Sequence, residues 1–320
     1  MTTRRFTVIH DDLGDDGSLQ GAVVAIGNFD GMHRGHRAVI NAAIARAKSG
    51  GGPSAVLTFE PHPRRYFRPN DRHFRLTDAK TKVRLLSHTD LDGVIVLTFD
   101  RQLAELTAEE FIHRVLVERF NVGGVVIGFD FHFGKDRGGT PDYLVKEGAR
   151  RSFGVDVVHA LEDEGKPVSA SSIRAELEAG RVVEAAELLG YPWFVTGDVI
   201  RGEKRGRDLG YPTANLRLDP DCGLKHGIYA VRVRIGDKIH DGVASFGRRP
   251  TFDNGAPLLE TYLFGFDGDL YGQEIDVAFV GWIRAEKRFE GIDALVRQMD
   301  DDSRRAREIL ERAPAAIPPA

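Results

Sequence analysis

The 320-residue chain contains a single cysteine, Cys222. One cysteine excludes an internal disulfide and any zinc site built on cysteines, so we expect Cys222 to be a small apolar core residue. Long apolar runs are missing too, since no stretch approaches the ~20 residues of a membrane-spanning helix. The opening residues run from two arginines into acidic residues, so we expect no secretory signal and a cytoplasmic protein.

The chain also lacks an excess of positive charge, because 44 lysines and arginines face 48 aspartates and glutamates and give a formal net charge of −4. A general nucleic-acid-binding protein carries a basic field that neutralises phosphates, so the balance disfavours that class. Local basic clusters occur in "PHPRRYFR" and "RGEKRGR". They suit a compact phosphate ligand, although a solvated loop fits the same residues. We expect small-molecule substrates, with no nucleic-acid or membrane partner.

Residues 20–160 alternate short runs rich in valine and isoleucine with helical patterns. The runs are apolar without strict alternation, as is typical of strands buried on both faces. Helices are expected over residues 36–48 and from a capping box in which Thr107 precedes Glu110. The expected strands are "AVVAIG", "SAVLTF", "GVIVLTF", "GVVIG" and "VDVVHA". Such units predict a parallel sheet with helices on both faces and a ligand at the carboxyl ends of the strands.

The pattern changes near residue 190, after which β-patterned runs are separated by turns of Gly, Asp, Asn and Pro. Val231 and Val233 alternate with Arg232 and Arg234, the period of a strand with one face in water. We therefore predict an antiparallel barrel or sandwich, closed by a helix near residues 290–311. The predicted domains are residues 1–190 and 191–312, followed by a flexible tail at 313–320.

The stretch "GNFDGMHRGH", residues 27–36, lies between a predicted strand and a predicted helix. Its glycines let a ligand approach the backbone, and the helix start directs amide groups and a positive dipole end at an anion. His33 and His36 can both hydrogen-bond phosphate oxygens. The spacing is neither GxGxxG nor a P-loop, which disfavours a dinucleotide oxidoreductase. A turn whose two histidines merely cap the helix is the alternative.

The segment His33-Arg34-Gly35-His36 resembles the (H/T)xGH motif of nucleotidyltransferases. Four later stretches resemble, in order, landmarks of the bacterial FMN adenylyltransferase module: "LTFEPHPRRYF", "LTAEEFIHRVL", "GFDFHFGKDRGG" and "VSASSIR". The resemblance implies catalytic roles for His33 and His36. It also implies nucleotide or phosphate contacts for Asn28, Asp30, Gly35, Ser169, Ser171 and Arg174, and flavin contacts for Phe129, Phe131 and Phe133.

One of these stretches departs from the family. The usual Ser-Ser-Thr is replaced here by Ser169, Ala170 and Ser171, which removes one hydroxyl. A neutral hydrogen bond is worth about 0.5–1.5 kcal/mol, so adenylyl transfer would slow about tenfold at most. Ser171 and Ser172 also suit a plain helix N-cap, which is compatible with an anion bound at the same place.

Residues 202–216, "GEKRGRDLGYPTANL", are too glycine-rich for a strand and unusually basic for a turn. A flexible arch of glycines with basic side chains attracts phosphates. The residues expected to do so are Gly202, Lys204, Gly206, Arg207 and Gly210. Thr213 and Asn215 carry oxygens suited to a hard cation such as Mg²⁺. Taken by themselves, these residues favour the alternative, a basic hairpin in which Thr213 and Asn215 only hydrogen-bond a turn.

Residues 195–310 resemble the riboflavin kinase module, notably in "GRDLGYPTANL", "GVASFGRRPTF" and "LLETYLFGF". The resemblance implies that Thr213 and Asn215 serve Mg²⁺ and ATP. It implies that Glu260, at the beginning of a strand, is the general base for the attacking alcohol. A surface glutamate at a strand start is the alternative. The family commonly has Asn, His and Asp where Ser245, Tyr262 and Gly265 stand, which bears on flavin affinity and turnover.

Together the resemblances imply an α/β Rossmann-like nucleotidyltransferase domain followed by an antiparallel β-barrel riboflavin kinase domain with a C-terminal helix. The implied function is bifunctional: ATP-dependent phosphorylation of riboflavin to FMN, then adenylyl transfer from ATP to FMN, which gives FAD and pyrophosphate. Two alternatives remain. One is a single working activity, the kinase; the other is a flavin-binding regulatory protein that binds flavin tightly and consumes no ATP.

Overall fold

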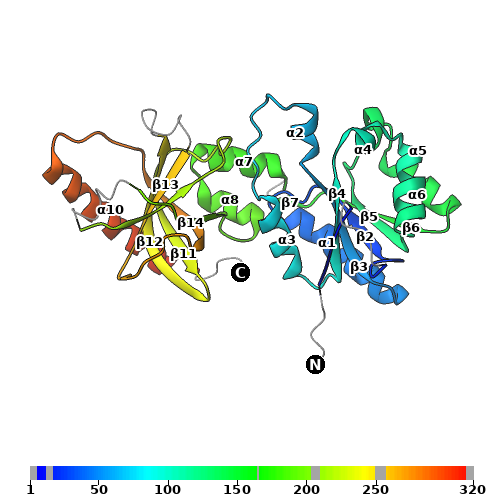
Figure 1. The fold of residues 1–320 in the computed structure, drawn as a ribbon, viewed down its shortest axis with the longest axis horizontal. Helices are drawn as coiled ribbons and strands as arrows, with labels where there is room; N and C mark the ends of the chain where they lie inside the picture. The colour runs from blue at the N-terminus through cyan, green and yellow to red at the C-terminus, as the bar shows by residue number, and fades with distance from the viewer. Residues whose placement is uncertain (1–5, 12–16, 164–165, 203–209, 249–256, 315–320) are drawn as a thin grey trace. The chain divides into compact units, whose positions relative to one another are not determined.

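A computed structural model describes the chain except for residues 1–5, 12–16, 164–165, 203–209, 249–256 and 315–320 (Figure 1). The predicted phosphate-contact residues Lys204, Gly206 and Arg207 lie outside the described residues, as does most of the predicted tail. The chain divides into two compact units. The first comprises Met1–His73 and Asp78–Val168; the second comprises Phe74–Thr77 and Ser169–Ala320. In the described part of the chain, no helix is long and apolar enough to cross a membrane.

The first unit is built on a six-stranded, wholly parallel sheet in the order β1-β4-β3-β2-β5-β6. Its strands are β1 (Thr7–His10), β2 (Val23–Ile26), β3 (Ser54–Glu60), β4 (Gly93–Thr98), β5 (Gly124–Gly128) and β6 (Gly154–Val158). The parallel sheet and all five predicted strands are confirmed. Strand β1 was missed because it is a four-residue edge strand with only Ile9 fully buried, so it has no apolar run.

Helices cover both faces of this sheet, as predicted (Figure 1). Helix α1 (Arg34–Gly50) packs on β2, β3 and β5, and α3 (Ala79–Ser87) packs on β4. On the other face, side chains of the sheet form one apolar core with the π-helix η1 (Phe111–Arg119) and with helix α6 (Pro141–Arg150). The remaining elements are α2 (Pro63–Phe67), α4 (Arg101–Glu105), α5 (Ala108–Glu110), the short turn η2 (Lys135–Arg137) and the hairpin β7–β8 (Glu162–Asp163 and Lys166–Pro167).

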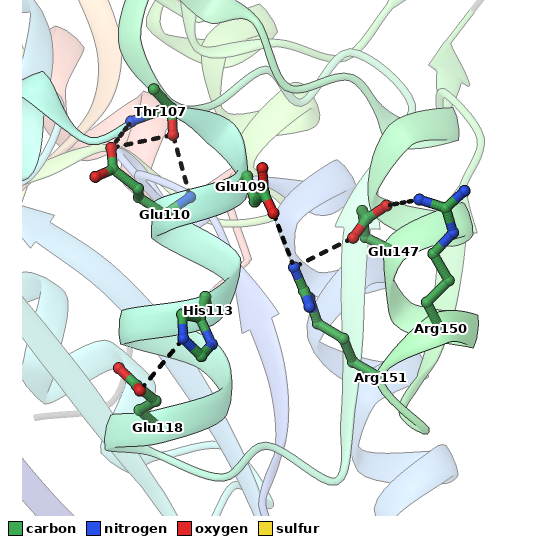
Figure 2. A network of polar contacts seen from close by, with 8 residues as sticks. All are labelled: Thr107, Glu109, Glu110, His113, Glu118, Glu147, Arg150 and Arg151. Atoms are coloured by element: carbon green, nitrogen blue, oxygen red, sulfur yellow. Dashed lines mark hydrogen bonds and ion pairs between the residues drawn. The ribbon is translucent and has the colours of Figure 1, made fainter.

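Polar contacts link the start of α5 to α6 (Figure 2). The predicted capping box is present: the Glu110 amide donates to the Thr107 hydroxyl at 3.2 Å, and the Thr107 amide donates to the Glu110 carboxylate at 3.0 Å. The Arg151 guanidinium lies 3.7 Å from Glu109 of α5 and 3.3 Å from the buried Glu147 of α6. The first turn of α5 is therefore held both by its cap and by its neighbour.

The second unit is built on an antiparallel sheet in the order β10-β13-β12-β11-β14-β9. Its strands are β9 (Phe194–Asp198), β10 (Thr213–Arg217), β11 (Gly227–Ile235), β12 (Lys238–Arg248), β13 (Pro257–Leu263) and β14 (Glu274–Arg284). The Ile200 amide donates to the Asn215 carbonyl at 2.8 Å, so the sheet nearly closes into a barrel. This confirms the predicted barrel.

The expectation that residues 202–216 contain no strand is wrong. Strand β10 begins after the last glycine of that segment, and the Ala214 and Leu216 side chains, two residues apart, are both buried.

In the described part of the second unit, three helices accompany the barrel. Helix α10 (Ile292–Arg312) packs on β11, β12 and β14 and confirms the predicted closing helix. Helices α7 (Ala170–Ala179) and α8 (Val182–Leu189) precede the barrel in the chain and pack together. They group with the barrel among the compact units. The prediction of a boundary near residue 190 stays a prediction.

The expected wet face of β11 is wrong at Arg232, whose side chain is buried, with 6% of the residue exposed. Its guanidinium donates to the carbonyls of Leu310 at 2.7 Å and Ala313 at 3.3 Å, and it pairs with Asp241 at 3.2 Å. The last carbonyls of a helix have no partners within the helix and lie at its negative end, so a cation there is favourable. Arg232 thus fastens the end of α10 to the barrel.

Candidate active sites

The loop between β2 and α1 carries the first candidate site and is conformationally strained. Phe29, Gly31 and Met32 have positive φ angles of 50°, 81° and 42°. This region is costly for side chains other than glycine, and such strain persists only where the surroundings impose it. The Phe29 and Met32 side chains are both buried, which anchors the loop. Strain held in this way is typical of a functional site.

His33 and His36 lie together at the start of α1. His33 is the N-cap, and its Nδ1 accepts a hydrogen bond from the His36 amide at 3.3 Å. The two rings stack with centroids 3.5 Å apart. Because Nδ1 is the acceptor, the proton of the neutral His33 ring is on Nε2, which can donate to an anion. The capping alternative therefore holds for His33.

Three more predicted ligands belong to this loop. Asp30 is buried and Asn28 is half-buried. A Cβ on Gly35 would lie 3.2 Å from the His33 ring and 3.4 Å from the Val168 carbonyl oxygen. A side chain at position 35 would thus crowd the capping ring. The structure brings together Asn28, Asp30, His33, Gly35 and His36.

The sheet topology places this loop beside a second predicted segment. The chain leaves β2 toward β3 and β4 and later returns to β5 on the other side of β2, so the strand order reverses between β2 and β5. Ligands of open α/β sheets bind at the carboxyl ends of the strands at such a reversal. The loop after β5 carries Phe129, Phe131 and Phe133. Phe129 is exposed, Phe131 packs on the core, and Phe133 is buried within it.

Gly134 seats this aromatic loop on α5. Its φ is 71°, and a Cβ there would lie 2.5 Å from the Ala108 nitrogen, a backbone atom with little freedom to move. Gly134→Ala should displace the aromatic loop and raise the KM for FMN in FAD formation by about tenfold, as expected for a misplaced binding group. Steady-state kinetics would test this against Gly50→Ala, since nothing lies within 4 Å of a Cβ at Gly50. An unchanged KM for FMN would count against a flavin role for the loop.

Three aromatic residues were missed by the sequence analysis. Phe67, which is 63% exposed, and Tyr66 form the end of α2, and their ring centroids lie 5.6 and 5.5 Å from that of Phe99, just after β4. The rings meet edge to face, a geometry favoured by aromatic pairs. The available signal was the "YF" pair inside the basic run "PHPRRYFR", which we interpreted through its arginines alone.

The predicted triphosphate contacts on α7 belong to the second unit. Ser169 is the N-cap of α7, and its hydroxyl accepts from the Ser172 amide at 3.2 Å. The alternative of an N-cap at Ser171 or Ser172 is therefore wrong, because the cap lies two or three residues earlier. Ser169 and Ser172 form a capping box, which requires two residues that are three positions apart. Ser171 is exposed, and the Arg174 Nε donates to the Phe74 carbonyl at 2.5 Å. Triphosphate contacts by these residues stay a prediction.

The second candidate site lies across three neighbouring barrel strands. Glu260 of β13 is directly opposite Asn215 of β10 on one side and Ser245 of β12 on the other. Residues directly opposite have Cβ atoms about 5 Å apart. Thr213 is opposite Tyr262, two residues along the same face. Glu260 is the fourth of seven residues in β13 and is half-buried, so its expected place at a strand start is wrong, while its role as the base stays a prediction.

Asn215 has the environment of a ligand-binding residue. It is 4% exposed, and its Nδ2 donates to the Thr213 carbonyl at 3.2 Å, which orients the amide. Within the described residues, its buried Oδ1 has no hydrogen-bond partner. A buried acceptor without a partner costs free energy, and a bound cation or donor would relieve that cost. Thr213 and Asn215 therefore suit the hard cation expected there.

Gly202 passes very close to this amide, because a Cβ at position 202 would lie 2.6 Å from Asn215 Nδ2 and 3.0 Å from its Oδ1. Gly202→Ala should push the Asn215 side chain aside and lower the riboflavin kinase kcat/KM for ATP by about tenfold, with FAD formation from FMN unchanged. Gly50→Ala would control for a glycine replacement that meets no neighbour, since no atom lies within 4 Å of a Cβ there and its φ is not positive. An equal fall of the kinase kcat/KM for ATP in both variants would show that the effect does not come from the contact between position 202 and Asn215.

Two tyrosines extend this site toward α10. The Tyr211 hydroxyl donates to the Asp300 carboxylate, and its ring lies edge-on to Tyr262 with centroids 4.8 Å apart. Burial and then the hydrogen bond to Asp300 raise the pKa of Tyr211 to about 12, so it remains a neutral donor near pH 7. Tyr262, the residue that replaces the common histidine, thus packs on the segment leading into β10. Gly210 and Gly265, with φ of 82° and 64°, form turns.

Comparisons with known proteins cover both units. A FAD synthetase family model matches residues 15–172, and a riboflavin kinase family model matches residues 189–310. The chain is 39% identical to a bifunctional riboflavin kinase/FMN adenylyltransferase of Pseudomonas fluorescens, covering 93% of this chain and 95% of that one. It is 37% identical to the protein of that name from Escherichia coli strain K12, covering 91% and 93%.

A solved structure is similar as well. A crystal structure described as a macrolide-efflux protein from Streptococcus pneumoniae matches with a TM-score of 0.82 and 32% identity, covering 94% of this chain and 98% of that one. The order of the two matched families agrees with the order of the parallel sheet and the barrel along the chain. From these matches and the two assembled sites, the chain belongs to the family of bifunctional riboflavin kinase/FMN adenylyltransferases.

Proposed function

We propose that the chain converts riboflavin to FMN in its barrel and FMN to FAD in its parallel-sheet domain. The proposal is carried by one observation: a single chain carries His33 and His36 at the helix start that follows β2 of the parallel sheet, and Glu260 directly opposite Asn215 in the barrel. We assign adenylyl transfer to residues 1–190 and the kinase to residues 191–312. Because both reactions consume ATP and small flavins, we expect a cytoplasmic enzyme with no nucleic-acid partner.

In adenylyl transfer, a phosphate oxygen of FMN attacks the α-phosphorus of ATP and the bond to pyrophosphate breaks. No protein nucleophile is needed, so catalysis consists of alignment and stabilisation of charge on the phosphoryl oxygens. His33, through Nε2, and His36 donate to those oxygens, and the start of α1 directs amide groups at them. Asn28, Asp30 and Gly35 shape the loop that receives the triphosphate. Ser169, Ser171 and Arg174 add further contacts, as the family resemblance implies.

In the kinase reaction, a riboflavin hydroxyl attacks the γ-phosphorus of ATP and ADP leaves. Glu260 accepts the hydroxyl proton, because an alcohol is a weak nucleophile until it loses that proton. Thr213 and Asn215 would hold Mg²⁺, consistent with the buried Asn215 oxygen that lacks a protein partner. Bound Mg²⁺ neutralises charge on the nucleotide phosphates. Gly202 and Gly210, with Lys204, Gly206 and Arg207, bind the phosphates.

The flavin ring of FMN needs an apolar, planar surface in the parallel-sheet domain. Phe129 and Phe131 after β5 supply one part of it. Tyr66 and Phe67 on α2 are further candidates, because exposed aromatic rings on a soluble surface commonly mark a binding site. The arginines beside them favour an anionic flavin such as FMN.

Chromatography of flavins tests the proposal. The purified chain is incubated with riboflavin, ATP and Mg²⁺, and separately with FMN, ATP and Mg²⁺. FAD in both reactions is the expected result. FMN from the first and nothing from the second would leave the kinase as the only activity. Flavin that is bound but unchanged in both would favour the regulatory protein.

A further inference from the structure

Lys82 of α3 is a buried cation in the parallel-sheet unit, with 2% of its side chain exposed. Lysine is almost never fully buried unless it is paired. Its ammonium group has three N–H donors. They face three acceptors: Glu60 Oε1 at 2.8 Å, Thr58 Oγ1 at 3.1 Å and the Asn28 carbonyl oxygen at 3.3 Å.

The third of these acceptors belongs to the strained loop. The Asn28 carbonyl also accepts a hydrogen bond from the Thr58 hydroxyl at 3.3 Å. Lys82 therefore reaches this carbonyl twice, once directly and once through Thr58. Hydrogen bonds in such a chain polarise and strengthen one another.

Holding the Asn28 carbonyl oxygen in place also orients the peptide group to which it belongs. The peptide bond is planar, so the direction of the Asn28 carbonyl sets the plane of the whole Asn28–Phe29 peptide. Of the residues that follow, Phe29, Gly31 and Met32 have positive φ angles, and this stretch leads directly to His33. The peptide held by Lys82 therefore sets the direction in which the strained loop starts.

An apolar side chain could fill this interior position without the cost of burying an ion pair. The observed charge instead supplies a directed, charge-assisted hydrogen bond to the loop. We propose that Lys82 is a positioning residue for adenylyl transfer, which holds the Asn28–Phe29 peptide so that the loop and the start of α1 meet the triphosphate of ATP. This inference rests on the proposed adenylyltransferase function.

The test is Lys82→Met, which keeps much of the length of the side chain and removes its charge and donors. The kcat/KM for ATP in FAD formation should fall by about ten- to a hundredfold, mainly through a higher KM for ATP, because a shift of about 1 Å misaligns reacting groups. The KM for FMN should stay the same. Phosphorylation of riboflavin by the same preparation should also be unchanged and serves as an internal reference. Lys80→Met, an exposed lysine on the same helix, is the matched control.

A purely structural role gives a different result. Lys82→Met would then lower kcat in proportion to the folded fraction measured by circular dichroism, with both KM values unchanged, and that outcome overturns the inference. If Lys82→Met does not fold, Thr58→Val provides the second variant, because it removes one donor to the Asn28 carbonyl and keeps the side-chain shape. A KM for ATP several-fold higher supports the inference, and an unchanged KM overturns it. A wild-type chain that makes no FAD overturns the proposed function as well.

Discussion

His36→Ala should abolish FAD formation from FMN and leave the phosphorylation of riboflavin nearly unchanged. The His36 ring stacks on His33 with centroids 3.5 Å apart, and its amide donates to His33 Nδ1. Removing the ring takes away one of the two proposed phosphate donors and lets the His33 ring turn. Loss of one preorganised donor costs about 10²–10³-fold in kcat, and the disturbance of His33 adds to this loss. The kinase residues lie on a separate sheet and keep their geometry.

The measurement is chromatography of flavins from parallel incubations with riboflavin and with FMN. His88→Ala is the matched control, because His88 is an exposed histidine of the same unit whose Nδ1 lies 2.9 Å from the Arg84 carbonyl oxygen and 3.5 Å from the Ser87 hydroxyl, both on α3. It should leave both reactions intact. Equal loss of both activities in His36→Ala would contradict the assignment of His36 to adenylyl transfer.

Glu260→Gln should stop FMN formation, while added FMN is still converted to FAD. Glutamine preserves the size of the side chain and its place between Asn215 and Ser245, but it cannot accept a proton. General base catalysis contributes about 10²–10⁴-fold, and the rate should fall by that factor. Initial rates of FMN and ADP release measure the effect.

The barrel offers a close control for this substitution. Glu274→Gln changes an exposed glutamate at the first position of β14 and should alter neither activity. If Glu260→Gln phosphorylates riboflavin at the normal rate, Glu260 is not the base. If it loses both activities, the variant is misfolded or the two sites are not independent.

Sequence patterns predicted most of the fold because buried strands leave a clear apolar signal. All five expected strands of the parallel sheet are present, and so is the cap at Thr107. The failures have local causes. Strand β1 is too short and too exposed to give a run of apolar residues. Strand β10 comes directly after a glycine-rich segment, and the whole stretch was therefore interpreted as a loop. The alternation of Arg232 with Val231 and Val233 predicts correctly that its side chain lies on the other face of the strand. It does not predict whether water or the end of a helix covers that face.

For the sites, the motifs predict which residues form them, and those assignments stay predictions; how the residues interact is visible only in the structure. The proton on His33 Nε2 follows from a hydrogen bond that spacing alone cannot reveal. Lys82 and Asn28 are 54 residues apart in the chain, and Tyr211 and Asp300 are 89 apart. No local pattern links such pairs, because only the folded sheets bring them together. The missing partner of Asn215 Oδ1 is likewise a property of the packed barrel.

The solitary thiol has a practical consequence for spectroscopy. Cys222 is buried, and burial raises its pKa to about 12, so almost no thiolate forms at neutral pH. Because the thiolate is the species that reacts with maleimides and iodoacetamides, the native chain is nearly inert to such dyes. A cysteine introduced on each unit, at exposed positions such as Lys80 and Glu274, would therefore take up a fluorophore pair without first removing Cys222. Energy transfer between the two dyes would then report whether the distance between the labelled positions changes while FMN is made and consumed.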